Sequence, residues 1–138
     1  MKDKYFIDTN ILVYANDRTE KGKYERAKQI LFNGIANEDI AISTQVLSEF
    51  YVTVTKKIKV KLPANTAKKE ILLLKAIEIV EIDFNLIIQA INISDKNKLT
   101  YWDSLIIAAA QEARCNIVYS EDFNPDQTIG SVTIKNPF

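Results

Sequence analysis

Four acidic side chains stand at positions from which a fold of alternating strands and helices could bring them to one place. They are Asp8, Glu49, Asp103 and Asp122. Asp8 directly follows a short apolar run, and Asp122 comes shortly after another. Glu49 and Asp103 lie in segments with helical periodicity, and Asp103 is near a helix start, where free backbone N–H groups favour an anion. Because ligands of open α/β sheets bind beyond the carboxyl ends of the strands, we expect the four carboxylates to converge at one edge of a sheet.

A carboxylate cluster is suited to a divalent cation and to the hydrolysis of a phosphodiester. Mg²⁺ and Mn²⁺ are hard cations that prefer oxygen ligands. The hydrolysis needs an activated water, neutralised charge on the phosphoryl oxygens and help for the leaving oxygen, and one or two such ions can supply all three. Crowded carboxylates also repel one another unless cations or protons compensate. The pattern therefore predicts a site for Mg²⁺ or Mn²⁺.

Each acid also has a purely structural interpretation. Asp8 could cap the helix that follows it, and Asp103 could serve only the N-terminus of its own helix. Glu49 could be a solvated helix residue, and Asp122 could belong to a turn. Taken singly, these residues do not distinguish a metal site from ordinary helix caps and surface acids.

The chain contains no histidine, which excludes several kinds of enzyme. Ser-His-Asp and Cys-His catalysis, histidine general bases and nearly all catalytic zinc sites need that side chain. The sequence also lacks the phosphate-binding loop of nucleotide hydrolases and the glycine fingerprint of dinucleotide-binding folds. An enzyme built from this chain would work with carboxylates, amides, hydroxyls and lysines.

The composition predicts one folded domain over residues 1–138 in a reducing cytoplasm. Hydrophobic residues make up 47% of the chain, while glycine and proline number three each. No apolar run approaches the ~18 residues that a membrane span needs, and the N-terminal segment has no signal-peptide layout. The single cysteine, Cys115, cannot form an internal disulfide.

Hydrophobic periodicity predicts strands that alternate with helices. The predicted strands are 4–7, 40–42, 77–82, 116–119 and 131–134, with a loop over 120–127. The predicted helices are 11–14, 24–37, 44–57, 64–75, 85–96 and 101–114, the last of them apolar nearly all round. This order predicts an α/β fold, a three-layer α/β/α sandwich around a short, mainly parallel sheet.

Two groups of residues are candidates for contact with a nucleic acid, although basic and acidic residues balance at 18 each. Lysines cluster after the Glu49 helix at Lys56, Lys57, Lys59 and Lys61. Lys57 and Lys59 could hold RNA phosphates beside the acids, and the alternative is a solvated helix end. Tyr101 and Trp102 could stack on a base, but we expect them to pack around the buried helix.

Five segments resemble the PIN-domain ribonucleases, especially the VapC-type toxins of toxin–antitoxin pairs. They are Phe6–Tyr14, Ser43–Tyr51, Tyr101–Ala110, Tyr119–Phe123 and the ending Asn136–Phe138. The first four resemble the family's four acid-bearing segments, and they occur in the family's order across the whole chain.

The resemblance implies a PIN-like fold, an RNA-cleaving enzyme and assignments for individual residues. Asp8 and Asp103 would be the principal ligands of Mg²⁺ or Mn²⁺, and Glu49 and Asp122 would complete the pocket directly or through water. The residues that would support these acids are Thr9 and Asn10, which could orient Asp8 or a water, and Glu121, which could share or replace the role of Asp122. The family further implies an RNA substrate, a cognate antitoxin that keeps the toxin inactive, and a homodimer.

Two other functions remain open. The same nuclease fold could serve RNA maturation or quality control without an antitoxin. A Mg²⁺-dependent phosphatase or phospho-acceptor domain also places an aspartate after its first strand, although such phosphatases usually have Asp-x-Asp where this chain has Asp8-Thr9-Asn10.

Overall fold

The computed structural model describes residues 2–138, which form one six-stranded sheet and six α-helices. The strands are β1 (Tyr5–Ile7), β2 (Ile40–Ser43), β3 (Glu78–Val80), β4 (Ile117–Tyr119), β5 (Thr128–Ile129) and β6 (Val132–Lys135). The helices are α1 (Thr9–Tyr14), α2 (Lys21–Asn37), α3 (Thr44–Lys56), α4 (Ala64–Leu73), α5 (Phe84–Asn97) and α6 (Tyr101–Glu112), and a 3₁₀ turn, η1 (Leu74–Ala76), follows α4. None of these helices is long and apolar enough to cross a bilayer.

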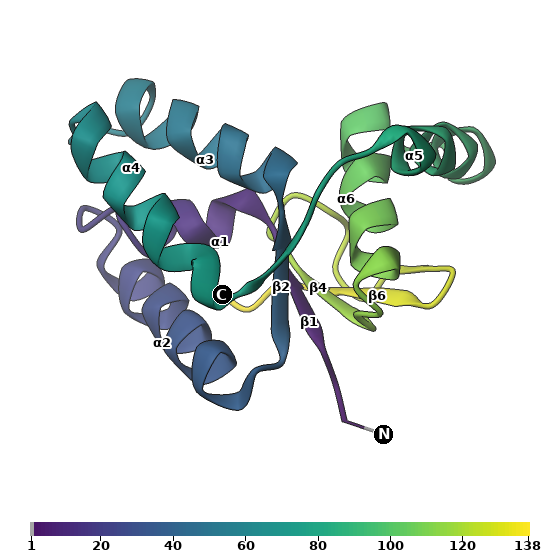
Figure 1. Cartoon of the computed structure of the whole chain (residues 1–138). Helices are drawn as coiled ribbons and strands as arrows, with labels where there is room; N and C mark the ends of the chain where they lie inside the picture. The colour runs from purple at the N-terminus through teal and green to yellow at the C-terminus, as the bar shows by residue number, and fades with distance from the viewer. Residues whose placement is uncertain (1) are drawn as a thin grey trace.

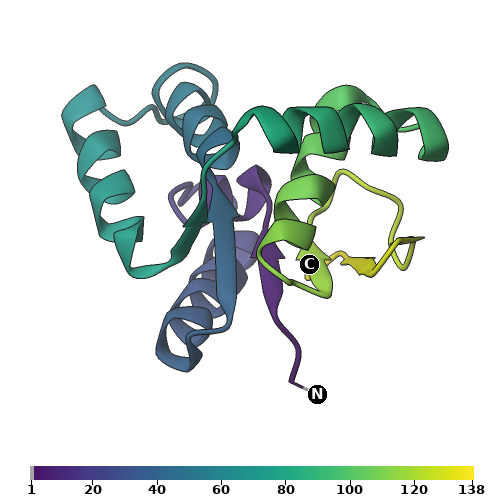
Figure 2. The same ribbon diagram turned by 45° about the vertical axis from the view of Figure 1, so that its right-hand side comes forward.

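The strands lie in the order β3-β2-β1-β4-β6-β5, and every neighbouring pair is parallel except β5 with β6. Figure 1 views the sheet nearly edge-on, with α1 to α4 on one face and α5 and α6 on the other. The turned view in Figure 2 shows the same division. The predicted three-layer α/β/α fold with a mainly parallel sheet is therefore confirmed.

The two central strands, β1 and β4, mark the point at which the strand order reverses. From β1 the chain proceeds to β2 and then β3 on one side, and it returns through α5 and α6 to β4 on the other side. In open α/β sheets such a switch point leaves a crevice beyond the carboxyl ends of the strands, and ligands bind there. The site is therefore expected next to the last residues of β1 and β4.

The apolar helix α6 is buried as its composition predicts. All seven residues from Ser104 to Ala110 are buried, because the helix lies between the sheet and α5. A helix that is apolar all round is stable only when it is covered on every side. This packing holds the N-terminus of α6, and with it Asp103, at the carboxyl edge of the sheet.

Four helices begin at this edge with a side-chain cap: α5 is capped by Asp83, and the other three lie closer to the acids. Asp8 caps α1, Ser43 caps α3 and Thr100 caps α6, each by accepting a hydrogen bond from a backbone N–H of the first turn. Such caps satisfy N–H groups that have no partner within the helix. The structural interpretation of Asp8, as the cap of the helix that follows it, is therefore confirmed.

Several predicted element boundaries were wrong. Helix α2 begins at Lys21 rather than at Tyr24, and the helix predicted over 64–75 changes to 3₁₀ geometry after Leu73. Helix α6 ends at Glu112 because the chain reverses at Arg114, which has a positive φ of 60°. The strand predicted over 77–82 keeps only Glu78–Val80.

The last predicted strand was shifted by one residue, and its partner was missed. Strand β6 is Val132–Lys135, and the short β5 pairs with it in a hairpin. The turn of the hairpin contains Gly130, whose φ of 61° suits glycine. Two residues are too few to show a strand pattern in the sequence. The extended conformation of β5 depends on its pairing with β6.

The two glycines of α2 provide a test of its packing against β2. A methyl group added to Gly34 would overlap the Ile40 side chain, lying 2.7 Å from its Cδ1 atom, whereas one added to Gly22 meets nothing within 4 Å. We expect Gly34→Ala to lower the free energy of unfolding by about 1–3 kcal/mol through overpacking. The control, Gly22→Ala, should raise it by about 0.5–1 kcal/mol, because alanine is the better helix former. Urea denaturation monitored by circular dichroism measures the free energy of unfolding of both variants. Equal stabilisation by the two changes would contradict close packing of Gly34 against Ile40.

Candidate active site

Asp8 is buried at the junction of the two central strands, with only 6% of its surface exposed. Its Oδ1 accepts a hydrogen bond from the backbone N–H of Thr9 at 2.7 Å, and its Oδ2 accepts one from the Ser120 hydroxyl at 2.7 Å. Its backbone N–H donates to the carbonyl of Tyr119 at 3.1 Å, which continues the pairing of β1 with β4. Both strands therefore fix the position of this carboxylate.

Burial raises the pKa of Asp8 to about 6. The hydrogen bonds from Ser120 and Thr9 favour the charged form and oppose this shift, while the charges of Asp122 and Glu49 add to it. A carboxylate that is both desolvated and close to other acids is a candidate for a functional site.

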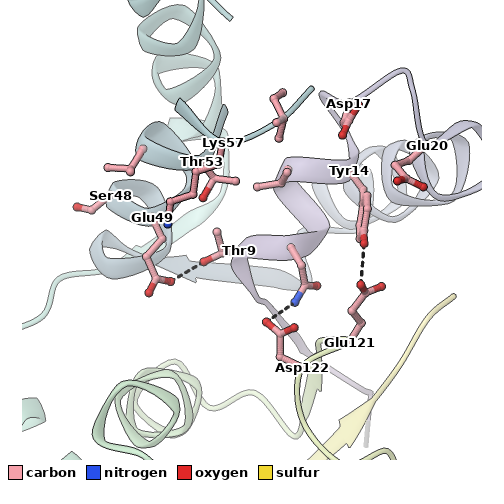
Figure 3. Close-up of a pocket in the computed structure, with 14 residues that line it drawn as sticks. Thr9, Tyr14, Asp17, Glu20, Ser48, Glu49, Thr53, Lys57, Glu121 and Asp122 are labelled. Carbon is pink, nitrogen blue, oxygen red and sulfur yellow. Dashed lines mark hydrogen bonds between the residues drawn. The ribbon is translucent and has the colours of Figure 1, made fainter. Parts of the chain in front are cut away.

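Glu49 reaches the same place from α3. The hydroxyl of Thr9 donates to Glu49 Oε1 at 2.7 Å, so a residue of α1 orients an acid of the neighbouring helix (Figure 3). The amide of Gln45, one turn earlier on α3, approaches Glu49 Oε2 at 3.4 Å. Glu49 itself is exposed and faces an open groove.

Asp122 lies in the loop after β4, and its carboxylate faces α1. The side-chain amide of Asn10 donates to Asp122 Oδ2 at 3.1 Å (Figure 3), and the Asp122 backbone N–H donates to the Ser120 hydroxyl at 3.1 Å. Asn10 also approaches that hydroxyl at 3.4 Å. Ser120 thus joins Asp8, Asn10 and Asp122, and so holds the fourth acid in place.

Asp103 completes the set from the first turn of α6. Partial burial raises the pKa of Asp103, and the negative charges of Asp122 and Glu49 raise it further. A hydrogen bond from Thr100 opposes this increase. Asp8 and Asp103 are therefore affected by the same two acids. The structure brings all four predicted carboxylates into one electrostatic neighbourhood at the carboxyl edge of the sheet.

Glu121 lies in a different network. Its carboxylate accepts a hydrogen bond from the Tyr14 hydroxyl at 2.6 Å and pairs with Lys23 at 3.1 Å. The Lys23 ammonium also lies over the rings of Tyr14 and Phe138, which pack edge to face. These contacts tie the loop that carries Asp122 to α1 and α2, so Glu121 anchors the loop and is not grouped with the other acids.

An open groove of about 770 Å³ runs along α1 and α3 beside the acids. Glu49, Asp122 and Glu121 lie on its wall, and Lys57 lies on the same wall near the end of α3 (Figure 3). Lys59 does not line it. The structure therefore separates the two lysines that the sequence treated alike.

The structure corrects one expectation about the aromatic pair. Tyr101 is partly buried, whereas 62% of the Trp102 surface is exposed. Trp102 lies on the outside of the first turn of α6, so it does not pack around the buried helix as we expected.

Sequence reasoning missed Ser120, Gln45 and the network of Tyr14 with Lys23. Ser120 follows the apolar run of β4 directly, and a polar residue at the end of a central strand was a usable signal. Gln45, Tyr14 and Lys23 are ordinary helix residues, and no signal in the sequence marks their partners.

The donor set fits a hard divalent cation, although the described side chains are not already arranged around one. Within residues 2–138, no three Asp, Glu, His or Cys side chains converge closely enough to hold an ion. Every candidate donor is nevertheless an oxygen, and Asn10 Oδ1 is a buried acceptor without a partner in this part of the chain. Glu49 and Asp122 are oriented by neutral groups, Thr9 and Asn10, which leave the negative charges of both acids unneutralised.

Comparison with known proteins identifies one family and one fold. The family model described as the PIN domain matches residues 5–128. This match favours a nuclease over the phosphatase or phospho-acceptor alternative. No curated protein sequence matches the chain.

Similar solved structures include three related to toxin–antitoxin systems. A toxin–antitoxin complex from Klebsiella pneumoniae matches with a TM-score of 0.68 and 21% identity, covering 98% of both chains. VapC20 of Mycobacterium tuberculosis, described as a sarcin–ricin loop cleaving toxin, matches with a TM-score of 0.67 and 17% identity over 88% of this chain and 92% of that one. VapBC2 of Rickettsia felis, bound to a fragment of promoter DNA, matches with a TM-score of 0.67 and 21% identity over 96% of this chain and 97% of that one. At these identities the likeness shows a shared fold.

The burial of Asp8 predicts a pH-dependent cost to the metal-free protein. Its pKa rises from 3.8 to about 6 on folding, so the native state binds this proton more tightly than the unfolded state does. The stabilising effect of that proton is complete below about pH 4 and is lost as the pH rises to about 6, at a cost of up to about 3 kcal/mol. Because asparagine also caps helices, Asp8→Asn should raise the free energy of unfolding at pH 7.5 by about 1–2 kcal/mol and flatten its decline between pH 4 and 6.

The matched control is Asp83→Asn, which changes an exposed aspartate that caps α5 in the same way. Urea denaturation in EDTA at several pH values measures both variants. A loss of stability in Asp8→Asn at pH 7.5, with Asp83→Asn unchanged, would show that the Asp8 charge stabilises the fold.

Proposed function

The chain belongs to the PIN domain family, and from this premise we propose that it is a metal-dependent endoribonuclease and the toxin of a toxin–antitoxin pair. The substrate is RNA, and the catalytic side chains are Asp8, Glu49, Asp103 and Asp122. The observation that carries the proposal is the buried Asp8 carboxylate, whose pKa is raised to about 6 at the switch point of the sheet, beside Glu49 and Asp122. Capping alone does not require such burial, since Asp83 caps α5 and is exposed.

Mg²⁺ or Mn²⁺ held by these carboxylates would neutralise charge on the phosphoryl oxygens and lower the pKa of a bound water. Asp8 and Asp103 are the principal ligands in this proposal, and Glu49 and Asp122 complete the set. Thr9 and Asn10 orient the last two acids through the hydrogen bonds at 2.7 and 3.1 Å.

The side chains themselves supply orientation and a path for a proton. The hydrogen bonds from Ser120 and Thr9 restrict rotation of the Asp8 carboxylate and so fix the orientation of its two oxygens. Glu49 is exposed to the groove and is held only by the Thr9 hydroxyl and, at 3.4 Å, the Gln45 amide, so it is the acid best placed to accept a proton from a water that attacks a bound phosphodiester. Glu121 takes no part in this step, because Tyr14 and Lys23 hold it.

The toxin assignment is supported by the similar structures, which include complexes of toxins with their antitoxins. We propose a cognate antitoxin that covers the groove and a homodimer of the toxin. A PIN nuclease of RNA maturation would share the same site but no antitoxin. An adjacent reading frame for a small DNA-binding protein, and inhibition of RNA cleavage by its purified product, would distinguish the two.

The proposal predicts RNA cleavage that requires a divalent ion and Asp8. Purified protein should cleave single-stranded RNA in Mg²⁺ or Mn²⁺ and lose the activity in excess EDTA. Asp8→Asn should reduce the cleavage rate by roughly a hundredfold or more, because charge and metal positioning contribute several kcal/mol to transition-state stabilisation. The capping control Asp83→Asn should cleave at the native rate. Undiminished cleavage in EDTA would rule out the metal.

The separation of Lys57 from Lys59 predicts which lysine contacts RNA. Lys57 lies on the groove wall roughly 12 Å along α3 from Glu49, while Lys59 lies outside the groove. We expect Lys57→Gln, in an Asp8→Asn background that does not cleave, to weaken RNA binding and reduce the log–log salt slope by about 0.7. The control, Lys59→Gln, should leave both quantities unchanged. Equal effects of the two changes would point to a diffuse electrostatic contribution instead.

A further inference from the structure

Trp102 is exposed directly beside the acid cluster. It precedes Asp103 in the first turn of α6, and 62% of its surface is accessible to solvent. The Tyr101 ring packs edge to face against the indole, with ring centroids 5.0 Å apart. The Trp102 carbonyl accepts a hydrogen bond at 3.2 Å from Gln45 of α3. Two helices therefore fix the backbone and one neighbouring ring restrains the indole, while much of the side chain faces water.

The indole lines a second cavity, of about 510 Å³, on the other side of Glu49 from the large groove. The cavity wall consists of Thr44, Gln45, Ser48, Glu49, Ile82, Trp102 and Leu105. Glu49 and Ser48 border both hollows. An RNA strand whose phosphate lies at the acids would therefore place an adjoining nucleotide in this cavity.

The chemistry of the cavity suits a nucleobase rather than a phosphate. Among the described residues of its wall there is no lysine or arginine, and its one charged member is an acid. Its surface is mainly apolar around an aromatic plate, and every nucleobase has a flat face that stacks on such a ring. Gln45 adds a buried side-chain oxygen that has no hydrogen-bond partner in residues 2–138.

We propose that Trp102 stacks on an unpaired nucleobase next to the scissile phosphate. This inference rests on the proposed ribonuclease function and deepens it. Stacking on a base face tolerates any sequence. A base within an uninterrupted duplex has both faces covered by its neighbours and cannot enter the cavity.

The chain contains a single tryptophan, so fluorescence excited at a wavelength that tyrosine does not absorb reports on Trp102 alone. The full chain carrying Asp8→Asn is titrated with a single-stranded RNA, with the same RNA annealed to its complement, and with a ribose-phosphate oligomer of equal length that lacks bases. Anisotropy of a label on each oligomer measures binding independently. We expect saturable quenching by the single strand and little by the other two. Binding of the single strand without a change in fluorescence would overturn the proposal.

Variants separate stacking from a structural role. In the same background, Trp102→Ala should weaken single-strand binding about tenfold, and Trp102→Phe should restore most of the affinity. The control is Phe84→Ala, which removes another exposed aromatic ring at the start of α5 and should bind RNA normally. Equal affinities of the Ala and Phe variants at Trp102 would overturn the proposal. A change in the oligomeric state of Trp102→Ala would do so too, because it would assign the indole to a contact between copies.

The proposed nuclease activity is measured separately on the native chain. Quenching by single-stranded RNA together with no cleavage in Mg²⁺ or Mn²⁺ would support the base site and contradict the nuclease. Cleavage with a normal rate in Trp102→Ala, at RNA concentrations well below saturation, would contradict the base site and leave the nuclease intact.

Discussion

The site depends on one unfavourable arrangement, a carboxylate buried at the carboxyl end of the central strand pair. Asp8 cannot move away from its neighbours, because β1 and β4 fix its backbone and Ser120 and Thr9 hold its two oxygens. Two hydrogen bonds offset part of the desolvation, and the raised pKa shows that they do not offset all of it. The packing of the surrounding hydrophobic core offsets the free energy that is lost when this carboxylate is buried.

The other acids are oriented by neutral groups and not by lysine or arginine. Thr9 donates a hydrogen bond to Glu49, and Asn10 donates one to Asp122. Two consecutive residues of α1 therefore orient two acids from different parts of the chain. An ion pair at either acid would cancel the charge that a cation needs, whereas a hydroxyl or amide orients the oxygen and leaves its charge in place. The one acid of this region that does pair with a lysine, Glu121, is held in a separate network with Tyr14.

The surroundings of the acids differ on the two sides of Glu49. On one side the large groove carries Lys57, and on the other the smaller cavity carries Trp102 and no basic residue of the described chain. In the proposed complex, a phosphate would contact Lys57 on the first side and a base would stack on Trp102 on the second. Such local contacts would not require an excess of basic residues over the whole chain.

The sequence alone predicts the alternating elements and the three-layer fold, because hydrophobic periodicity is a local property. It also nominates the four acids as site residues from their types and their places along the chain. It could not determine that Ser120 binds Asp8, that Glu121 belongs to Tyr14 and Lys23, or that Lys57 and not Lys59 faces the groove. Those outcomes depend on the angle at which helices cross and on the register of β1 with β4. The exposure of Trp102 was decided in the same way: the covering of α6 by the sheet and α5 leaves the outer side of its first turn uncovered, and only the tertiary packing defines which side that is.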